Sequence, residues 1–465
     1  MINLSKENLS SLFRAYDIRG LYPDPLSENF IRNLGRAVGE LAADRGENTI
    51  ISGYDGRLSS PRLSSALNSG LLDSGREVIN IGLVPTPVLY FAAKTIGTGS
   101  GVMLTGSHNP PKFNGCKIMI AGETLFGDHI KQLSDKVLYK KRMVSRLGQF
   151  YCHDILPQYS NHILKNIKCQ KTLKVAIDCG NGVAGVLAPK LLKELNFDVI
   201  SLYCDVDGSF PNHHPDPAKP DNLTDLISAV KTHKCDIGFA FDGDGDRVSV
   251  ITNKGENIYA DRVLMLLAEE VLSRNPAGTV VYDVKCSNHL KPFILKCGGK
   301  PEMWKTGHSL IKSRMKELNA VLAGEMSGHV FFQDRWFGFD DGIYTACRIL
   351  EIITSKVEST HEIFSSIPNS FNTPELSIEV EDSKKFEVIE KFSQQISKRG
   401  FLKITIDGVR VEFTNGWGLV RASNTTPNIV LRFEADNKSS LIKIRNTIIQ
   451  CLWEAEPQLN GVYPC

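Results

Sequence analysis

The sequence lacks several features that define broad protein classes. No apolar run approaches the roughly 20 residues that a membrane-spanning helix requires. The opening MINLSKENLSSLFRAYDIRG has no continuous apolar segment of the kind found in secretory signals. The formal net charge is only +2, whereas proteins that bind nucleic acid or anionic membranes more often have a strong basic excess. We therefore expect a cytoplasmic protein with no membrane and no nucleic-acid partner.

The cysteines also exclude two kinds of scaffold. There are 11 of them, an odd number, scattered along the chain and never in a C-x-x-C spacing. Neither a disulfide framework nor a zinc cluster fits this distribution. We expect most of them to be small buried apolar residues.

What the chain does have is the size and composition of a multidomain globular protein. Its 465 residues exceed what one hydrophobic core supports. Short apolar runs that end in glycine or aspartate alternate with helix-like segments, as in TIISGYDGR, GVMLTGSHN, KVAIDCGNG and DIGFAFDGD. This alternation predicts βαβ units around parallel sheets, with ligands at the carboxyl ends of the strands. We predict three such α/β domains, at 1–150, 151–253 and 254–366.

The last part of the chain, 367–465, has a different pattern. It follows a segment rich in Ser, Pro and Asn, SSIPNSFNTPELS, which is typical of a linker. Strand-like runs with an Asp-Gly between alternating apolar residues indicate a hairpin, and two helix-like segments accompany them. We predict a C-terminal α+β domain with antiparallel pairing.

Three aspartates alternate with glycines in FDGDGDRVSV: Asp242, Asp244 and Asp246. An EF-hand would need glycine and glutamate where Arg247 and Asn253 stand. A solvated polar turn is the simpler alternative, but three like charges at this spacing repel one another unless a cation lies among them. A few hard carboxylate oxygens suit Mg²⁺, which completes its shell with water or a phosphoryl oxygen. We predict a magnesium site.

A second loop, TGSHNPPK, places Ser107 after a predicted strand and before a stiff Pro-Pro segment. The G-x-S-x-G elbow of serine hydrolases is absent. Taken alone, Ser107 is most simply an ordinary loop serine. Beside a magnesium site, however, its hydroxyl can carry a phosphoryl group whose charge the metal neutralises.

Two further loops have the chemistry to bind a sugar phosphate, although each is weak evidence alone. RASNTTP combines the Arg421 guanidinium with hydroxyls and backbone N–H groups, which suits a phosphate dianion. GEMSGH offers Glu325 and Ser327, a carboxylate and a hydroxyl that can bind vicinal sugar hydroxyls.

One motif points to a different class of protein. KVAIDCGNGVAG contains Gly180, Gly182 and Gly185 in the G-x-G-x-x-G spacing of a dinucleotide site, with Asp205 near the end of the next strand-like run. An NAD(P)-dependent oxidoreductase is therefore the alternative from another class. It leaves the serine, aspartate and arginine loops without a role, so a tight strand-to-helix turn is the interpretation we favour.

Taken together, TGSHNP, DGDGDR, GEMSGH and RASNTTP occur in the order and spacing of the α-D-phosphohexomutases, and the resemblance covers essentially the whole chain. GEMSGH, the opening FRAYDIRG and HVFFQDRWFGFDDG look most like the bacterial phosphomannomutase/phosphoglucomutase branch. The resemblance implies three related α/β domains with mixed sheets and a C-terminal α+β domain, heart-shaped around a central cleft.

The resemblance also implies roles for individual residues. Ser107 matches the serine that carries the phosphoryl group and contributes to the metal site with Asp242, Asp244 and Asp246. The other residues implied to be catalytic are His108, Lys117, Arg247 and His329. Those implied to bind substrate are Tyr16, Arg19, Lys285, His308, Glu325, Ser327, Arg421, Ser423, Asn424 and Thr425.

The implied function is an isomerase that interconverts hexose 1-phosphate and hexose 6-phosphate, for mannose and glucose. It would use an enzyme phosphoserine, Mg²⁺, and glucose 1,6-bisphosphate as activator and intermediate. We expect a monomer whose partners are small-molecule sugar phosphates. The nearest alternative is phosphoglucosamine mutase, which performs the same chemistry on a sugar with an amino group at C2.

Overall fold

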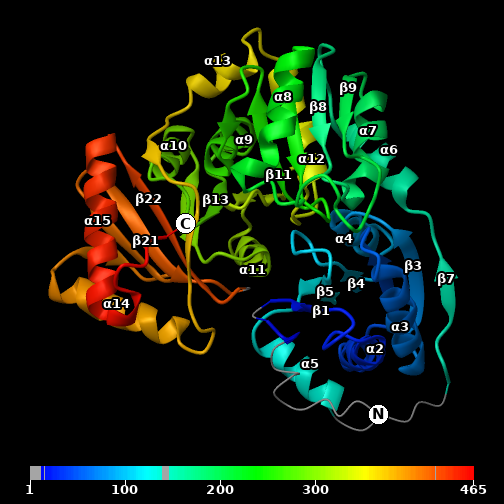
Figure 1. The fold of residues 1–465 in the computed structure, drawn as a ribbon. Coiled ribbons are helices and arrows are strands. Elements are labelled where there is room, and N and C mark those ends of the chain that lie inside the picture. The colour runs from blue at the N-terminus through cyan, green and yellow to red at the C-terminus, as the bar shows by residue number, and fades with distance from the viewer. Residues whose placement is uncertain (1–11, 15, 139–145, 425, 465) are drawn as a thin grey trace.

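The computed structural model describes residues 12–14, 16–138, 146–424 and 426–464. Four sheets follow one another in chain order along an arc, so that the first and last domains face each other across the centre (Figure 1). A 3.5 Å ion pair between Arg14 and Asp382 joins these two domains. Within the described ranges, no helix is long and apolar enough to cross a membrane.

The first sheet has seven strands in the order β1-β5-β4-β2-β3-β7, with β6 beside β5. The pairs among β2, β3, β4 and β7 are parallel, and those that β5 makes with β1, β4 and β6 are antiparallel. The strands are β1 (Ile18–Leu21), β2 (Thr49–Tyr54), β3 (Glu77–Leu83), β4 (Gly101–Leu104), β5 (Phe113–Ile120), β6 (Glu123–Thr124) and β7 (Phe150–Cys152). The helices are α2 (Glu28–Asp44), α3 (Ser60–Asp73), α4 (Thr86–Thr95) and α5 (Asp128–Leu138).

The second sheet has the order β12-β11-β10-β8-β9 and is also mixed, since β11 is antiparallel to both of its neighbours. Its strands are β8 (Lys174–Asp178), β9 (Asp198–Leu202), β10 (Ile237–Phe241), β11 (Val248–Thr252) and β12 (Asn257–Ile258). The helices of this region are α6 (Leu156–Asn166), α7 (Ala188–Glu194) and α8 (Thr224–His233), with short 3-10 turns at Val183–Val186 and Pro220–Leu223.

The third sheet, β14-β13-β15-β16, is parallel except for β16. Its strands are β13 (Thr279–Asp283), β14 (Lys300–Trp304), β15 (Leu322–Gly324) and β16 (Val330–Phe332). The helices are α9 (Ala260–Arg274), α10 (Leu290–Lys296), α11 (His308–Leu318), α12 (Gly342–Thr354) and α13 (Thr360–Ser365).

The fourth sheet, β17-β22-β21-β20-β19 with β18 beside β22, is antiparallel throughout, as predicted for the C-terminal domain. Its strands are β17 (Phe371–Asn372), β18 (Leu376–Glu379), β19 (Leu402–Ile404), β20 (Val409–Phe413), β21 (Gly416–Ala422) and β22 (Asn428–Ala435). The helices are α14 (Lys385–Lys398) and α15 (Lys438–Ala455), followed by a 3-10 turn at Pro457–Leu459. The predicted Asp-Gly hairpin is present, since β19 and β20 pair antiparallel. Gly408, in the turn between them, has φ +76°.

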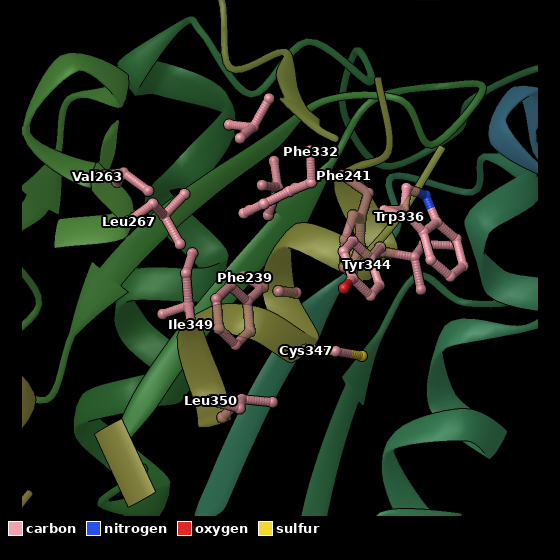
Figure 2. Close-up of a cluster of buried hydrophobic side chains, with 14 of the residues drawn as sticks. Phe239, Phe241, Val263, Leu267, Phe332, Trp336, Tyr344, Cys347, Ile349 and Leu350 are labelled. Carbon is pink, nitrogen blue, oxygen red and sulfur yellow. The ribbon is translucent and has the colours of Figure 1, made fainter. Parts of the chain in front are cut away.

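One hydrophobic cluster, the shared core, includes side chains of the first three domains, and the first domain has a further cluster of its own. Most buried apolar side chains of the fourth domain form a separate cluster, while Trp417 and Leu419 pack with Val284 of the third domain. Figure 2 shows part of the shared core, where side chains of α9, β10, β16 and α12 interdigitate. Trp336 stacks on Tyr344 with ring centroids 4.0 Å apart. Because helix α12 follows the third sheet in the chain but contacts β10 and β11 of the second, these two domains form a continuous unit.

Candidate active site

A cavity of about 250 Å³ lies at the centre of the arc and receives side chains from all four domains. Most residues singled out in the sequence line it: Tyr16, Arg19, Ser107, His108, Lys117, Arg247, Lys285, His308, Glu325, Ser327, His329, Arg421, Ser423 and Asn424. Thr425 lies outside the described residues. The three aspartates do not line the cavity. They lie behind Ser107, whose Oγ donates to Asp242 Oδ2 over 2.9 Å.

The Ser107 loop connects β4 to β5 and holds the serine in a rare backbone conformation. Ser107 has φ +47°, a region that residues with a side chain seldom occupy. The Ser107 N–H donates to Thr105 Oγ1 over 2.8 Å. The side chain is nearly fully buried, and its Oγ lies 3.2 Å from His108 Nδ1. The loop therefore presents one defined hydroxyl between a carboxylate and an imidazole.

Arg57, which follows β2, holds this backbone from behind. Its guanidinium is 1% exposed and donates to the carbonyl oxygens of Ser107 and Asn109 at 2.7 and 2.6 Å. Its other terminal nitrogen donates to those of Pro110 and Phe113 at 2.7 and 2.8 Å. No pattern in the sequence pointed to Arg57, because its partners lie some 50 residues further along the chain.

Asp55 completes the support. Its carboxylate accepts from the Arg57 Nε and from Thr105 Oγ1 at 3.1 and 2.9 Å. It also accepts from the Gly106 N–H at 3.1 Å and the Ser60 hydroxyl at 2.7 Å. A Cβ at Gly106 would lie 2.4 Å from the Arg57 guanidinium, which explains the glycine before the serine. The Ser107 conformation is thus determined by a buried polar network.

The predicted metal loop connects β10 to β11, and its three carboxylates converge. Asp242, Asp244 and Asp246 are fully buried, with one oxygen from each within 4.8 Å of the others. Lys117 Nζ lies 2.7 Å from Asp244 Oδ2 and also contacts Asp246. The Thr86 hydroxyl, which the sequence did not single out, donates to Asp244 Oδ2 over 2.6 Å.

Burial and charge shift the pKa values of these groups in opposite directions. Burial raises the pKa of Asp242 well above its ordinary value, and the charges of Asp244 and Asp246 raise it further. Burial opposes ionisation of Asp244 too, but its contacts with Lys117 bring its pKa below the usual range. For Lys117, the two carboxylates outweigh burial and raise its pKa well above normal. The raised pKa of Asp242 reflects burial together with repulsion among three carboxylates that only partly pair with Lys117, and a further cation would relieve that repulsion.

The donor set fits Mg²⁺. Asp244 Oδ1 and Asp246 Oδ1 are buried and have no hydrogen-bond partner among the described residues. Buried carboxylate oxygens without partners are costly, and three hard oxygens beside a serine hydroxyl are ligands that Mg²⁺ accepts. A second group, Asp246, His329 and Asp340, also satisfies the spacing of metal ligands.

His329 lies on the loop that precedes β16, between charged groups from two domains. Its Nε2 is 2.9 Å from the Nε of Arg247, which donates to it. Its Nδ1 is 3.0 Å from Asp340 Oδ2 and 3.5 Å from Asp246 Oδ1. The sequence did not single out Asp340, a fully buried carboxylate that also accepts from Lys312 Nζ at 3.0 Å.

In His108 and His308 the surroundings favour the neutral form of the imidazole. Burial lowers the pKa of His108 well below normal, and the nearby cations Arg247 and Arg19 lower it further. Burial, with Lys312 next, does the same for His308. An uncharged imidazole accepts a proton, so His108 is a suitable acceptor beside Ser107.

On the third domain, Glu325 and Ser327 follow β15 and face the same cavity. Glu325 Oε1 accepts from the Gly307 N–H over 2.6 Å, and its Oε2 has no partner among the described residues. Burial raises the pKa of Glu325 above normal. Carboxylate and hydroxyl together provide the expected acceptor and donor for sugar hydroxyls.

On the fourth domain, Arg421 lies near the end of β21, just before the loop to β22. Its Nε donates to Asp407 Oδ2 over 3.1 Å, and the same oxygen accepts from the Thr306 N–H at 3.0 Å. Further along, Ser423 Oγ accepts from the Thr426 N–H and hydroxyl at 3.1 and 2.8 Å. Side chains of the loop thus bond to one another, and Asp407 and Lys385, which donates to the Thr426 carbonyl oxygen over 3.2 Å, hold it from outside.

The glycine-rich turn after β8 has no room for a dinucleotide. A Cβ at Gly182 would lie 2.9 Å from the Gly243 backbone, and one at Gly185 would lie 1.9 Å from the Cys204 carbonyl oxygen. These glycines allow close backbone packing, of Gly182 against the metal loop and of Gly185 against Cys204, within the turn that the sequence predicted.

The fold and this cavity define a class of protein before any comparison. Four domains bring cationic side chains to one cavity, where the Ser107 hydroxyl lies against an acidic cluster. Four family profiles match consecutive parts of the chain, all described as phosphoglucomutase/phosphomannomutase. They are alpha/beta/alpha domain I at 10–142, domain II at 157–255, domain III at 259–371 and the C-terminal domain at 375–450.

Relatives agree with these matches. The chain is 53% identical over 436 residues to a phosphomannomutase/phosphoglucomutase of Pseudomonas aeruginosa, with 94% of each chain covered. It is 48% identical to a phosphoglucomutase of Neisseria meningitidis serogroup A over 463 residues, 99% of each chain. A crystal structure of a phosphoglucomutase/phosphomannomutase family protein from Burkholderia thailandensis superposes with a TM-score of 0.91 at 45% identity, covering 98% of this chain and 99% of that one.

A more distant solved structure shares the fold. It is an N-acetylphosphoglucosamine mutase of Aspergillus fumigatus in complex with GlcNAc-6P and magnesium, with a TM-score of 0.61 at 14% identity and 96% of each chain covered. The chain described here belongs to the phosphoglucomutase/phosphomannomutase family, within the α-D-phosphohexomutase superfamily. The predicted family and four-domain fold are confirmed.

Proposed function

We propose that the protein interconverts the 1-phosphates and 6-phosphates of mannose and glucose, with Ser107 as the carrier of the transferred phosphoryl group. One observation carries this proposal: a single buried hydroxyl, 2.9 Å from the acidic cluster, faces a cavity lined by cations from four domains. The curated relatives named above support the same reaction class.

In the first half-reaction, the Oγ–P bond of phospho-Ser107 breaks and a bond forms between phosphorus and the free hydroxyl of the sugar phosphate. The product is a hexose 1,6-bisphosphate, which we propose as both intermediate and activator. After it turns around in the cavity, its other phosphoryl group returns to Ser107. In each half-reaction the attacking hydroxyl loses a proton and the oxygen that phosphorus leaves gains one. His108 Nδ1, 3.2 Å from Ser107 Oγ, is placed to give this proton to Oγ in the first half-reaction and to take it back in the second.

Several side chains can stabilise the charge on the transferred group. We assign Asp242, Asp244 and Asp246 as the ligands of Mg²⁺, which when bound would neutralise phosphoryl oxygens. Lys117 remains charged because the carboxylates raise its pKa. Arg247 and His329 form the adjacent wall, and their 2.9 Å contact aligns them with each other.

The other end of the substrate is bound by a different set of groups. We propose that Arg421, Ser423, Asn424 and Thr425 bind the phosphate that is not transferred, and that Glu325 and Ser327 bind sugar hydroxyls. Tyr16, Arg19, Lys285 and His308 complete the substrate contacts. A phosphate site of N–H and hydroxyl groups is tolerant of which end of the sugar carries the phosphate.

Dual specificity follows if Glu325 and Ser327 contact the hydroxyls at C3 and C4, which glucose and mannose share. We expect kcat/KM values for glucose 1-phosphate and mannose 1-phosphate within roughly 100-fold of each other. Assays on glucosamine 6-phosphate distinguish the alternative phosphoglucosamine mutase. A strong preference for that amino sugar would replace the proposal.

The test of the carrier is Ser107→Ala, with the exposed Ser65→Ala of helix α3 as a matched control. We expect Ser107→Ala to lose nearly all mutase activity while circular dichroism shows an intact fold, and Ser65→Ala to keep wild-type rates. Wild-type activity in Ser107→Ala would identify another residue as the carrier.

A further inference from the structure

Outside the cavity, two cysteines lie in direct contact. Cys179 follows β8, and Cys204 lies two residues beyond β9. Their Sγ atoms are 3.5 Å apart. The strands are parallel neighbours with Asp178 opposite Leu202, and the Cys179 N–H donates to the Leu202 carbonyl oxygen over 3.1 Å. Sheet pairing, rather than a chance approach of two flexible side chains, brings these thiols together.

The two thiols differ in accessibility. Cys179 is fully buried, whereas Cys204 is half-buried. Contact with the Cys179 thiol lowers the pKa of Cys204, which increases its thiolate fraction. An accessible cysteine beside a buried one is the arrangement in which the first thiol reacts and the second resolves the product.

The pair is mechanically linked to the metal loop. The turn after Cys179 is closed by the Gly182 N–H, which donates to the Cys179 carbonyl oxygen over 2.7 Å. The Val183 N–H then donates to the Gly243 carbonyl oxygen at 3.1 Å. Even one added carbon at Gly182 would lie 2.9 Å from Gly243, which stands between Asp242 and Asp244. A shift of Cys179 therefore presses on the aspartate loop.

We propose that Cys179 and Cys204 form a redox modification site at which hydroperoxides produce an intramolecular disulfide. In the first step the Cys204 thiol reacts with hydrogen peroxide to give a sulfenic acid and one water. In the second, the Cys179 sulfur attacks the Cys204 sulfur, the S–O bond breaks, and a second water leaves with the thiol proton. Both cysteines are oxidised by one electron each, and one peroxide is reduced to two waters.

The disulfide changes the geometry next to the aspartate loop. The sulfur atoms must approach from 3.5 Å to a bond length of about 2.05 Å. Because the turn after Cys179 packs closely against Gly243, we expect this movement to shift the backbone between Asp242 and Asp244. We expect the affinity of the oxidised protein for Mg²⁺ to fall roughly 10-fold, the lower range for a disturbed second shell of a metal site.

The first measurement is covalent and does not depend on the proposed mutase reaction. Full-length protein is treated with one equivalent of hydrogen peroxide, alkylated under denaturing conditions and digested without reduction. We expect two fewer alkylated thiols than the 11 cysteines of the sequence, and a Cys179–Cys204 cross-linked peptide that reductant removes. Cys204→Ser and Cys179→Ser should each abolish this peptide, and the exposed Cys152→Ser should not.

The second measurement is isothermal titration with Mg²⁺ before oxidation, after oxidation and after reduction. Wild type should lose affinity reversibly, while Cys204→Ser keeps the same affinity under all three conditions. The proposal is overturned if all thiols of the wild-type protein remain reactive, if Cys204 accumulates as sulfinic acid without the cross-link, or if the cross-linked protein binds Mg²⁺ as tightly as the reduced one.

Discussion

The Ser107 loop and the Arg421 loop face the same cavity but are held in different ways. The Ser107 loop belongs to the three domains that share one core, and a buried guanidinium binds four of its carbonyl oxygens. The Arg421 loop belongs to the domain with a separate core. Its arginine pairs with Asp407, and its hydroxyls bond to one another.

This difference corresponds to the two tasks of the proposed reaction. A phosphoryl group is transferred efficiently only when donor and acceptor are held in a fixed geometry. The site for the other phosphate must instead accept either end of the sugar. A backbone fixed by a buried network suits the first task, and an adaptable loop of side-chain donors suits the second.

Among variants that compare the two loops, Arg57→Lys should lose the most activity. Lysine keeps the positive charge but has no planar fork, so the carbonyl oxygens of Ser107 and Asn109 lose the hydrogen bonds that Arg57 donates, at about 1–3 kcal/mol each. We expect kcat to fall roughly 100-fold or more with a smaller change in KM. The reason is that the variant misplaces the phosphoserine but keeps the groups that bind the substrate.

The matched control for Arg57→Lys is Arg32→Lys, an exposed arginine of the same domain that pairs with Asp73 on the surface. This control should keep wild-type kinetics. A change confined to KM in Arg57→Lys would show that the network does not position the serine.

Arg421→Lys should have a smaller and different effect. The guanidinium can bind a phosphate through two parallel hydrogen bonds, whereas an ammonium acts as a point charge. We expect KM for glucose 1-phosphate to rise roughly 30-fold with little loss of kcat, and the phosphate content of Ser107 to stay at the wild-type level. Unchanged KM with a lower kcat would mean that this loop acts on the transfer step itself.

The smallest expected effect concerns stability and compares two helix caps. Asp341 begins α12 in the shared core and accepts from the Tyr344 N–H at 2.9 Å and the Tyr159 hydroxyl at 2.7 Å. Burial raises its pKa from 3.8 to about 7. Folding therefore favours the protonated form of Asp341. The stability that this provides is fully present below about pH 4 and is lost as the pH rises to about 7.

Asparagine at this position is a neutral acceptor at every pH. The gain in the free energy of unfolding from Asp341→Asn should therefore be about 2 kcal/mol larger at pH 8 than at pH 5. The control is Asn437, a cap that accepts from the Ser440 N–H at the start of α15 in the separate domain. Asn437→Ser should change the free energy of unfolding equally at both pH values. A gain from Asp341→Asn that is independent of pH, measured by denaturant unfolding, would contradict the assignment of a protonated Asp341.

The sequence allowed the motif-bearing loops to be predicted, because their chemistry is local. Ser107, Asp242 and Arg421 each occur in a short run with turn residues at its ends, and the structure brings all three runs to one cavity or directly behind it. The antiparallel C-terminal domain followed from alternating apolar residues. These signals require no knowledge of distant contacts.

The supporting residues could not be predicted for the opposite reason. Arg57 acts on carbonyl oxygens about 50 residues away, and Asp340 reaches His329 only through the packing of a loop. Short strands such as β12 and β17 pair through main-chain hydrogen bonds that no side-chain pattern encodes. A single sequence does not show which distant backbone a buried arginine or aspartate will meet.

The most direct test is a chase of labelled phosphate. Protein phosphorylated with radiolabelled glucose 1,6-bisphosphate is purified and mixed with unlabelled mannose 1-phosphate. The account predicts that the label maps to Ser107, leaves the protein at a rate no slower than turnover, and appears in mannose 1,6-bisphosphate. Label that maps elsewhere, or that stays on the protein while mannose 6-phosphate is formed, would contradict it.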